Sequence, residues 1–251
     1  MAAPRFYVSL DAQALDEALL RAEEIALPPK AAHHAGRALR LRTGEEVVVF
    51  AGSGRQWRGV IRFDKDGAFV KLSAAEDPKV EAPIRMTLVQ ALVSPEKLDW
   101  IIEKAVETGV SAVVLTPAAR SVTRLSGERL EKRLNKLQDI AVSAAEQCGR
   151  NIVPAITAAP SWAKALESVR AERRLILAPG APQGGHLTGR EASVAFAVGP
   201  EGGFSPEEIA LAEDAGWDSV LLGPRVLRTE TAGMAAAVWL NTLSGDYAGM
   251  R

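Results

Sequence analysis

Two glycine-containing segments near the C-terminal end carry the side chains with the most potential for chemistry. The first, residues 199–204 (GPEGGF), directly follows the apolar run 194–198 and precedes residues 205–208 (SPEE). Ser205 and Glu208 have the spacing of a helix capping box, so the pattern predicts a strand, a tight loop and a helix. Because glycine lets a ligand approach the backbone, we expect a binding site at this strand end. The alternative is a tight turn without a ligand.

This first loop lacks the features of the common phosphate-binding motifs. A P-loop ends in lysine and a hydroxyl residue, whereas this loop contributes Glu201, whose charge repels phosphate. The early Gly52-Ser53-Gly54 lies in a predicted hairpin and lacks the following helix of a dinucleotide-binding fingerprint. We therefore expect a ligand that is not chiefly a phosphate.

The second segment, residues 222–233 (LGPRVLRTETAG), precedes an apolar helix predicted over Met234–Leu243. It brings Arg228 and Glu230 close together, and such side chains stabilise charge or exchange protons in active sites. Alternatively, one of its threonines caps the helix and the two charged residues form a surface ion pair. Because the two segments follow successive strands, we favour a shared site.

The elements around these segments alternate between apolar strands and helical patterns from Ile84 onward. This alternation is typical of βαβ units and a mostly parallel sheet, hence of an α/β fold. One helix is expected after Ser94 as N-cap, with Pro95 at its first position, and another from Ser126 to Gln147. The strands are expected at 85–93, 111–116, 174–178, 193–198 and 219–222.

The N-terminal part has a different pattern of apolar and turn-forming residues. Residues 1–73 contain short strand patterns separated by turn signals, which predicts a small β-barrel with one helix near Lys30–Leu41. Residues 74–83 carry two prolines and several charges without periodicity, which marks a linker. We therefore expect domains at 1–73 and 84–251. The strands of the first domain are expected at 6–8, 46–50, 57–63 and 68–72.

Composition excludes several classes of protein. The 30 Lys and Arg balance 31 Asp and Glu, so the global charge predicts no polyanion partner. A single cysteine, Cys148, excludes an internal disulfide framework, and with three histidines it leaves no usual zinc pattern; we expect no metal. No targeting segment or long apolar run is visible, which predicts a cytoplasmic protein without a membrane span.

Several short motifs occur in an order that is specific as a set. They are GPEGGFSPEE at 199–208, LGPRVLRTETA at 222–232, RFYV at 5–8, EKAVETG at 103–109, RS at 120–121 and AEQCGR at 145–150. This set resembles the RsmE-type family, the bacterial 16S rRNA uridine-N3 methyltransferases of the knotted SPOUT superfamily. The resemblance implies an α/β domain with a deep trefoil knot that binds S-adenosyl-L-methionine. It also implies a PUA-like barrel that helps to bind RNA, and a homodimer with the active site near the subunit interface.

The resemblance also assigns roles to residues. Methylation at uracil N3 requires loss of the imide proton from an unpaired or flipped base. We expect Arg228 to stabilise the resulting charge and either Glu230 or Glu201 to accept the proton. The residues expected to hold the cofactor are Leu177, Ala178, Gly199, Pro200, Glu201, Gly202, Leu222, Gly223, Val226, Leu227, Arg228, Thr231 and Ala232.

The expected partner is the 16S rRNA of the small ribosomal subunit. Residues 120–136 carry a local net charge of +4, which suits phosphate contacts, although a solvated helix face gives the same pattern. Two other functions stay open: a knotted methyltransferase that acts on another RNA such as tRNA, or a non-catalytic RNA-binding assembly factor. The residues expected to contact RNA, by resemblance or basic charge, are Arg5, Arg120, Arg124, Gln147 and Arg150.

Overall fold

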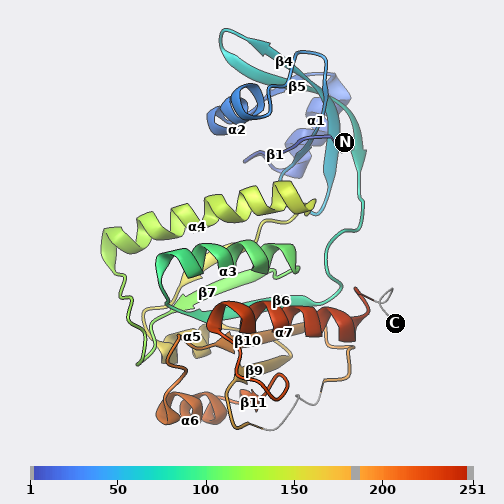
Figure 1. The fold of residues 1–251 in the computed structure, drawn as a ribbon. Helices are drawn as coiled ribbons and strands as arrows, with labels where there is room; N and C mark the ends of the chain where they lie inside the picture. Colours follow the sequence, from blue (N-terminus) through green and yellow to red (C-terminus); the bar gives the residue numbers. More distant parts are fainter. Residues whose placement is uncertain (1–2, 182–186, 248–251) are drawn as a thin grey trace. The chain divides into compact units, whose positions relative to one another are not determined.

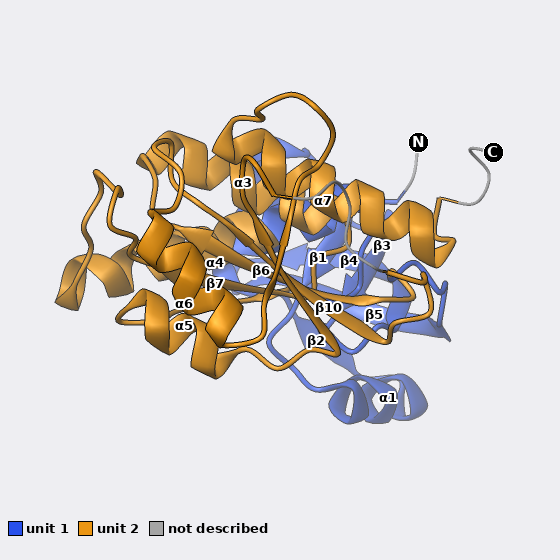
Figure 2. Cartoon of the chain, turned by 90° about the horizontal axis from the view of Figure 1, so that it is seen from below, with its two compact units in different colours: residues 1–81, 142–153 blue, residues 82–141, 154–251 orange. Residues whose placement is uncertain are grey.

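The computed structural model describes residues 3–181 and 187–247, and the chain divides into two units (Figure 2). Unit 1 comprises residues 1–81 and 142–153, and unit 2 comprises residues 82–141 and 154–251. Helix α4 (Gly127–Cys148) is continuous, and its last residues belong to unit 1. The contribution of residues 142–153 to unit 1 was not predicted, because the helical pattern of α4 continues across the boundary between residues 141 and 142. The predicted linker at 74–83 contains the end of strand β5.

Unit 1 is built on a five-stranded sheet with the order β1-β3-β4-β5-β2. Its pairs are antiparallel except for β1 with β3, which is parallel. In this order β1 and β2 are edge strands, so the described sheet is open and the predicted closed barrel stays a prediction. The strands are β1 (Arg5–Tyr7), β2 (Glu24–Ala26), β3 (Glu46–Phe50), β4 (Gln56–Asp64) and β5 (Gly67–Glu76).

Three helical segments accompany this sheet. Helix α2 (Pro29–His33) continues as the π-helical segment η1 (His34–Ala38), so the predicted helix near 30–41 exists but ends earlier. Helix α1 (Ala12–Arg21) was not predicted, because Leu20 is exposed and obscures the apolar stripe formed by the buried residues of that helix.

The core of unit 1 includes buried residues of the antiparallel neighbours β4 and β5. Alternate residues of β4, including Trp57 and Ile61, are fully buried, as expected for a strand with one face on the core. Gly59 lies between them at a register shift in the pairing with β5. A Cβ at Gly59 would come within 2.5 Å of Val70 Cγ1, so the close approach of these two strands requires glycine there.

Unit 2 is built on a six-stranded sheet with the order β11-β9-β10-β6-β7-β8, and all its described pairs are parallel. The five predicted strands are therefore confirmed as part of a parallel sheet. The short β8 was not predicted. The strands are β6 (Arg85–Ala91), β7 (Ala112–Thr116), β8 (Ala155–Ala158), β9 (Arg173–Leu177), β10 (Ser193–Val198) and β11 (Asp218–Val220).

Helices cover both faces of this sheet (Figure 1). Helices α5 (Trp162–Ser168) and α6 (Pro206–Asp214) pack on the face that carries Val89 and Ala195. Helix α7 (Thr229–Ser244) packs against α3 (Pro95–Glu107) and lies on the other face, where its Gly233 adjoins Leu88. The sheet is buried on both sides, which explains why β10 is a continuous apolar run.

The helix ends agree with the sequence signals at two places and differ at a third. Ser205 and Glu208 form the predicted capping box of α6, and α3 begins at Pro95 after Ser94. Helix α7, however, begins at Thr229 rather than at Met234. Arg228 occupies the N-cap position, so neither threonine of the segment caps the helix. The second segment is therefore partly a loop and partly the first turn of α7.

Candidate functional site

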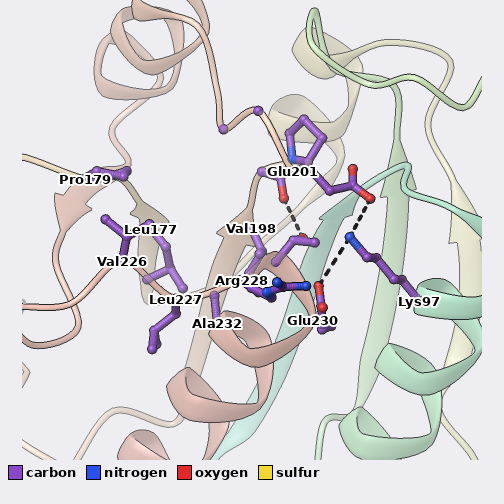
Figure 3. Close-up of a pocket in the computed structure, with 15 residues that line it drawn as sticks. Lys97, Leu177, Pro179, Val198, Glu201, Val226, Leu227, Arg228, Glu230 and Ala232 are labelled. Atoms are coloured by element: carbon purple, nitrogen blue, oxygen red, sulfur yellow. Dashed lines mark hydrogen bonds and ion pairs between the residues drawn. The ribbon is translucent and has the colours of Figure 1, made fainter.

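A cavity of about 450 Å³ lies where β9 and β10 end and α7 begins (Figure 3). Small-molecule sites in proteins have volumes of this order and combine apolar walls with a few polar groups. Leu177, Val198 and Leu227 supply apolar side chains here. A smaller cavity of about 70 Å³ adjoins it and shares Leu177 and Leu227.

The structure brings the two glycine-containing segments together, as the sequence predicted. Ala178 and Leu222 line the smaller cavity only. Gly223 and Thr231 line neither: Gly223 has a φ of +70° in the turn before α7, and the Thr231 amide bonds Arg228 O in the first helical turn. The predicted residues that line the larger cavity are Leu177, Gly199, Pro200, Glu201, Gly202, Val226, Leu227, Arg228, Glu230 and Ala232.

The first glycine loop is held in one conformation by its own backbone and by its neighbours. The Gly203 amide donates to Pro200 O at 2.9 Å, and the Arg120 guanidinium donates to Gly202 O at 2.9 Å. A Cβ at Gly199 would lie 3.0 Å from Phe204 N, so a larger residue would push the loop outward. The loop is thus preorganised, and its backbone lines the cavity.

Thr229 links the two segments to the sheet. Its hydroxyl donates to Gly199 O at 2.7 Å and accepts a hydrogen bond from Gln90 Nε2 at 3.1 Å. Gln90 is fully buried in β6, and Thr229 is only 6% exposed. The start of α7, the end of β10 and the end of β6 are therefore joined through one hydroxyl. Gln90 was not predicted as a site residue, although a single glutamine within the apolar stretch 88–93 is a signal that could have found it.

Replacing Thr229 with valine tests this link. Valine keeps the shape but removes the hydroxyl, which leaves buried polar partners unsatisfied and is expected to lower the free energy of unfolding by about 1–3 kcal/mol. Urea-induced unfolding followed by circular dichroism measures the change. Thr229→Ser retains the hydroxyl and serves as the matched control. Equal stability of the valine and serine variants would contradict the proposed link.

Charged side chains gather at one wall of the cavity. Lys97 Nζ lies 3.0 Å from Glu201 Oε1 and 3.8 Å from Glu230 Oε2 (Figure 3). Burial raises the pKa of the Glu201 carboxyl, but hydrogen bonds from its own backbone amide and from Lys97 outweigh burial, so this pKa lies below its ordinary value. Lys97 was missed because it is an ordinary polar residue of α3, far from both segments in the sequence.

Arg228 and Glu230 retain free hydrogen-bonding capacity at this wall. The Arg228 guanidinium makes no hydrogen bond or ion pair with any residue that the structure describes. Glu230 Oε2 is buried and has no hydrogen-bond partner among the same residues. A cavity that offers a guanidinium without a partner among the described residues and a carboxylate oxygen without a hydrogen bond can bind a ligand, move a proton and stabilise negative charge.

Two of the residues predicted to contact RNA are engaged inside unit 1. The Arg5 guanidinium donates to Gln56 Oε1 at 2.7 Å and to Asn151 Oδ1 at 2.5 Å. Arg150 is 5% exposed and forms an ion pair with Glu81 at 2.8 Å. These contacts give both arginines a structural role, so we leave them out of the RNA surface proposed below.

The basic stretch at 120–136 is partly neutralised. Arg133 and Lys136 both pair with Asp99, at 2.7 and 2.8 Å. Arg120 is exposed but holds the glycine loop, whereas Arg124 is exposed and forms no hydrogen bond or ion pair with the described residues. The helical part of the stretch therefore fits the solvated-face alternative better than a row of phosphate contacts.

Comparison with known proteins shows which family the chain belongs to. Residues 80–241 match the RNA methyltransferase domain family, and residues 27–73 match the RNA methyltransferase PUA domain. The chain is 35% identical over 223 residues to ribosomal RNA small subunit methyltransferase E of Mycobacterium bovis, covering 85% of this chain and 84% of that protein. The chain belongs to the ribosomal RNA small subunit methyltransferase E family.

Other relatives agree with this family membership. The methyltransferase E of Bacillus subtilis is 27% identical over 243 residues, which cover 92% of this chain and 93% of that protein. The crystal structure of methyltransferase E from Neisseria gonorrhoeae, bound to S-adenosyl methionine, superposes with a TM-score of 0.85 at 32% identity. That match covers 96% of this chain and 98% of the other. The N-terminal unit is accordingly PUA-like.

Within residues 3–181 and 187–247, no three His, Cys, Asp or Glu side chains are grouped so that they could hold a metal ion. No helix in the same residues combines the length and apolar character needed to cross a membrane.

Proposed function

We propose that this protein transfers a methyl group from S-adenosyl-L-methionine to N3 of a uridine in the decoding region of 16S rRNA. Membership in the methyltransferase E family supports the cofactor and the small-subunit rRNA as substrate. The observation that carries the N3 chemistry is that two groups line one cavity. They are the Arg228 guanidinium, which has no partner among the described residues, and the Glu230 carboxylate, one oxygen of which lacks a hydrogen bond among them.

The cavity fits the cofactor in size and in the character of its walls. Its volume of about 450 Å³ lies in the range of small-molecule sites. The backbone of residues 199–203 offers hydrogen-bonding groups without side chains at the glycines, and Leu177, Leu222 and Leu227 offer apolar contact. The ionised Glu201 carboxylate favours a ligand that carries positive charge. When bound, S-adenosyl-L-methionine supplies a methyl group already activated on a sulfonium.

The residues of the site then have to prepare the uracil. The base must leave its stack, because N3 lies on its Watson-Crick edge. The N3–H bond breaks, the proton passes to the Glu230 carboxylate and the electron pair stays on N3. The negative charge spreads to O2 and O4, where the Arg228 guanidinium donates a hydrogen bond. Alignment of the anion is the remaining task of the protein.

We assign the proton to Glu230 rather than to Glu201 on the basis of their contacts. Glu201 Oε1 is already bonded to Lys97 at 3.0 Å, and the lowered pKa of this carboxyl makes it the weaker base. Glu230 Oε2 makes no hydrogen bond within the described residues, and Glu230 is among the residues that line the cavity. General bases need a lone pair that is not committed to another donor.

Further parts of the proposal concern RNA and the partner subunit. We assign phosphate contacts to Arg120 and Arg124, with Gln147 as a further RNA contact, because all three are exposed. We also assign a homodimer, supported by the partly exposed apolar Val238 and Leu243 on α7. Light scattering coupled to size-exclusion chromatography tests the dimer. A measured molar mass equal to that of one chain would refute it.

The finer features of the fold also belong to this proposal. We expect the C-terminal domain to contain a deep trefoil knot and the N-terminal domain to close as a PUA-like barrel, as the family resemblance implies. Domain limits near 73 and 84, and a cytoplasmic location with the ribosomal subunits, complete it. An experimental structure in which the backbone is traced from Leu177 to Ser244 tests the threading directly.

The experiment that tests the function is methyl transfer from labelled S-adenosyl-L-methionine to small ribosomal subunits that lack their modifications. We expect label in 3-methyluridine at one site of 16S rRNA, located by nuclease mapping and mass spectrometry of nucleosides. Label in tRNA alone would show that the substrate is another RNA. Cofactor binding without transfer to any RNA, or absence of binding, would favour the non-catalytic assembly factor.

A further inference from the structure

Lys97 occupies a position that neither glycine segment supplies. It lies in the first turn of α3, whereas Glu201 follows β10 and Glu230 lies in the first turn of α7. Its ammonium group reaches both carboxylates, at 3.0 Å and 3.8 Å. The charged groups that line the cavity together with Lys97 are Glu201, Arg228 and Glu230. Lys97 is the residue through which α3 contacts both acids.

We infer that Lys97 is a positioning residue for methyl transfer: it holds Glu201 on the cavity wall and places a positive charge beside the Glu230 carboxylate that accepts the proton. This inference rests on the proposed function and adds a residue to it. The role assigned to Lys97 is exerted through these two acids, because its ammonium group donates a hydrogen bond to Glu201 and forms an ion pair with Glu230.

The electrostatics of Glu230 give the reason. A carboxylate whose Oε2 is buried without a hydrogen bond loses hydration, which is costly unless an opposite charge lies nearby. The nearby Glu201 carboxylate adds repulsion between like charges, whereas a cation within about 4 Å attracts both acids. Lys97 is the cation found at that range from Glu230 among the described residues. Without it, this wall of the cavity would hold two carboxylates and no ammonium group between them.

Stability alone does not account for the pair. The Lys97 side chain is 30% exposed and that of Glu201 is 35% exposed, and ion pairs at such exposure contribute little to folding. The same ammonium group contacts two acids that come from different parts of the chain, so its removal would affect both acids of the site at once. Anchoring α3 alone would require only one of these contacts.

The test compares Lys97→Met with Lys97→Arg in the full-length protein. Loss of the positive charge beside the two acids should lower the single-turnover rate at neutral pH by about tenfold. Activity should return at alkaline pH, where uracil N3 loses its proton to solvent and needs no base. Lys97→Arg keeps the charge and should keep a rate close to that of the wild type. A loss of equal size at every pH, not rescued by arginine, would overturn the inference.

A second measurement separates this inference from the proposed function. The carboxyl carbons of isotopically labelled glutamates can be observed by NMR without any RNA, with Glu230→Gln and Glu201→Gln used for assignment. We expect the signals of both acids to move in Lys97→Met, or in Lys97→Gln if methionine prevents folding, because the ammonium contacts both carboxylates. Unmoved signals would refute the role of Lys97. Moved signals without methyl transfer by the wild type would refute the proposed function and leave the contacts of Lys97 intact.

Discussion

Replacing Glu230 with glutamine should lower the single-turnover rate of methyl transfer by about 10²- to 10⁴-fold at neutral pH. Glutamine has nearly the shape of glutamate but cannot take up the N3 proton. Cofactor affinity should be preserved, because Glu230 is assigned to the substrate and not to the cofactor. The measurement uses saturating labelled cofactor and small subunits that lack their modifications, with cofactor binding followed by calorimetry.

Two comparisons make this result specific. The variant should recover activity at alkaline pH, because uracil N3 then loses its proton to solvent and needs no base. Glu201→Gln is the matched control: it weakens one partly exposed pair with Lys97, so its rate should fall by about tenfold or less. If Glu201→Gln lowers the rate of methyl transfer more than Glu230→Gln does, the proton acceptor has been assigned to the wrong acid.

Replacing Arg228 with alanine is expected to slow methyl transfer by about 10²- to 10³-fold, the usual effect of losing one donor to a developing oxyanion. Arg228 lines the cavity, and its guanidinium makes no hydrogen bond or ion pair with the described residues, so alanine removes no such bond. The stability of the fold should therefore stay unchanged, which a urea titration checks. The loss should appear in the rate constant at saturating substrate.

Two arginine variants provide the controls. Arg228→Lys keeps the charge but not the planar donor pair, and should recover only part of the rate. Arg225→Ala removes an exposed arginine that lines the smaller cavity but not the larger one, and should have the smaller effect. Equal losses in Arg225→Ala and Arg228→Ala would indicate that both act through general charge on RNA rather than at the reacting base.

Features that depend on neighbouring residues could be predicted from the sequence. The capping box of Ser205 and Glu208, the apolar strand 193–198 and the glycine loop between them all involve residues close in the chain. Short elements such as β8 escaped prediction, since four residues carry too little periodicity. The start of α7 was placed too late, because its first turn is polar where it faces the cavity.

The sequence by itself determined the parallel α/β plan, the two segments of the candidate site and the family motifs that they carry. Only the tertiary structure decided which hydrogen-bond and ion-pair partners the polar and charged side chains have. Lys97 and Glu201 are 104 residues apart, and Gln90 and Thr229 are 139 apart. It also showed that Arg5 and Arg150 are occupied inside unit 1. The physical reason is that hydrogen bonds and ion pairs depend on distances set by packing, and no local pattern of residues encodes them.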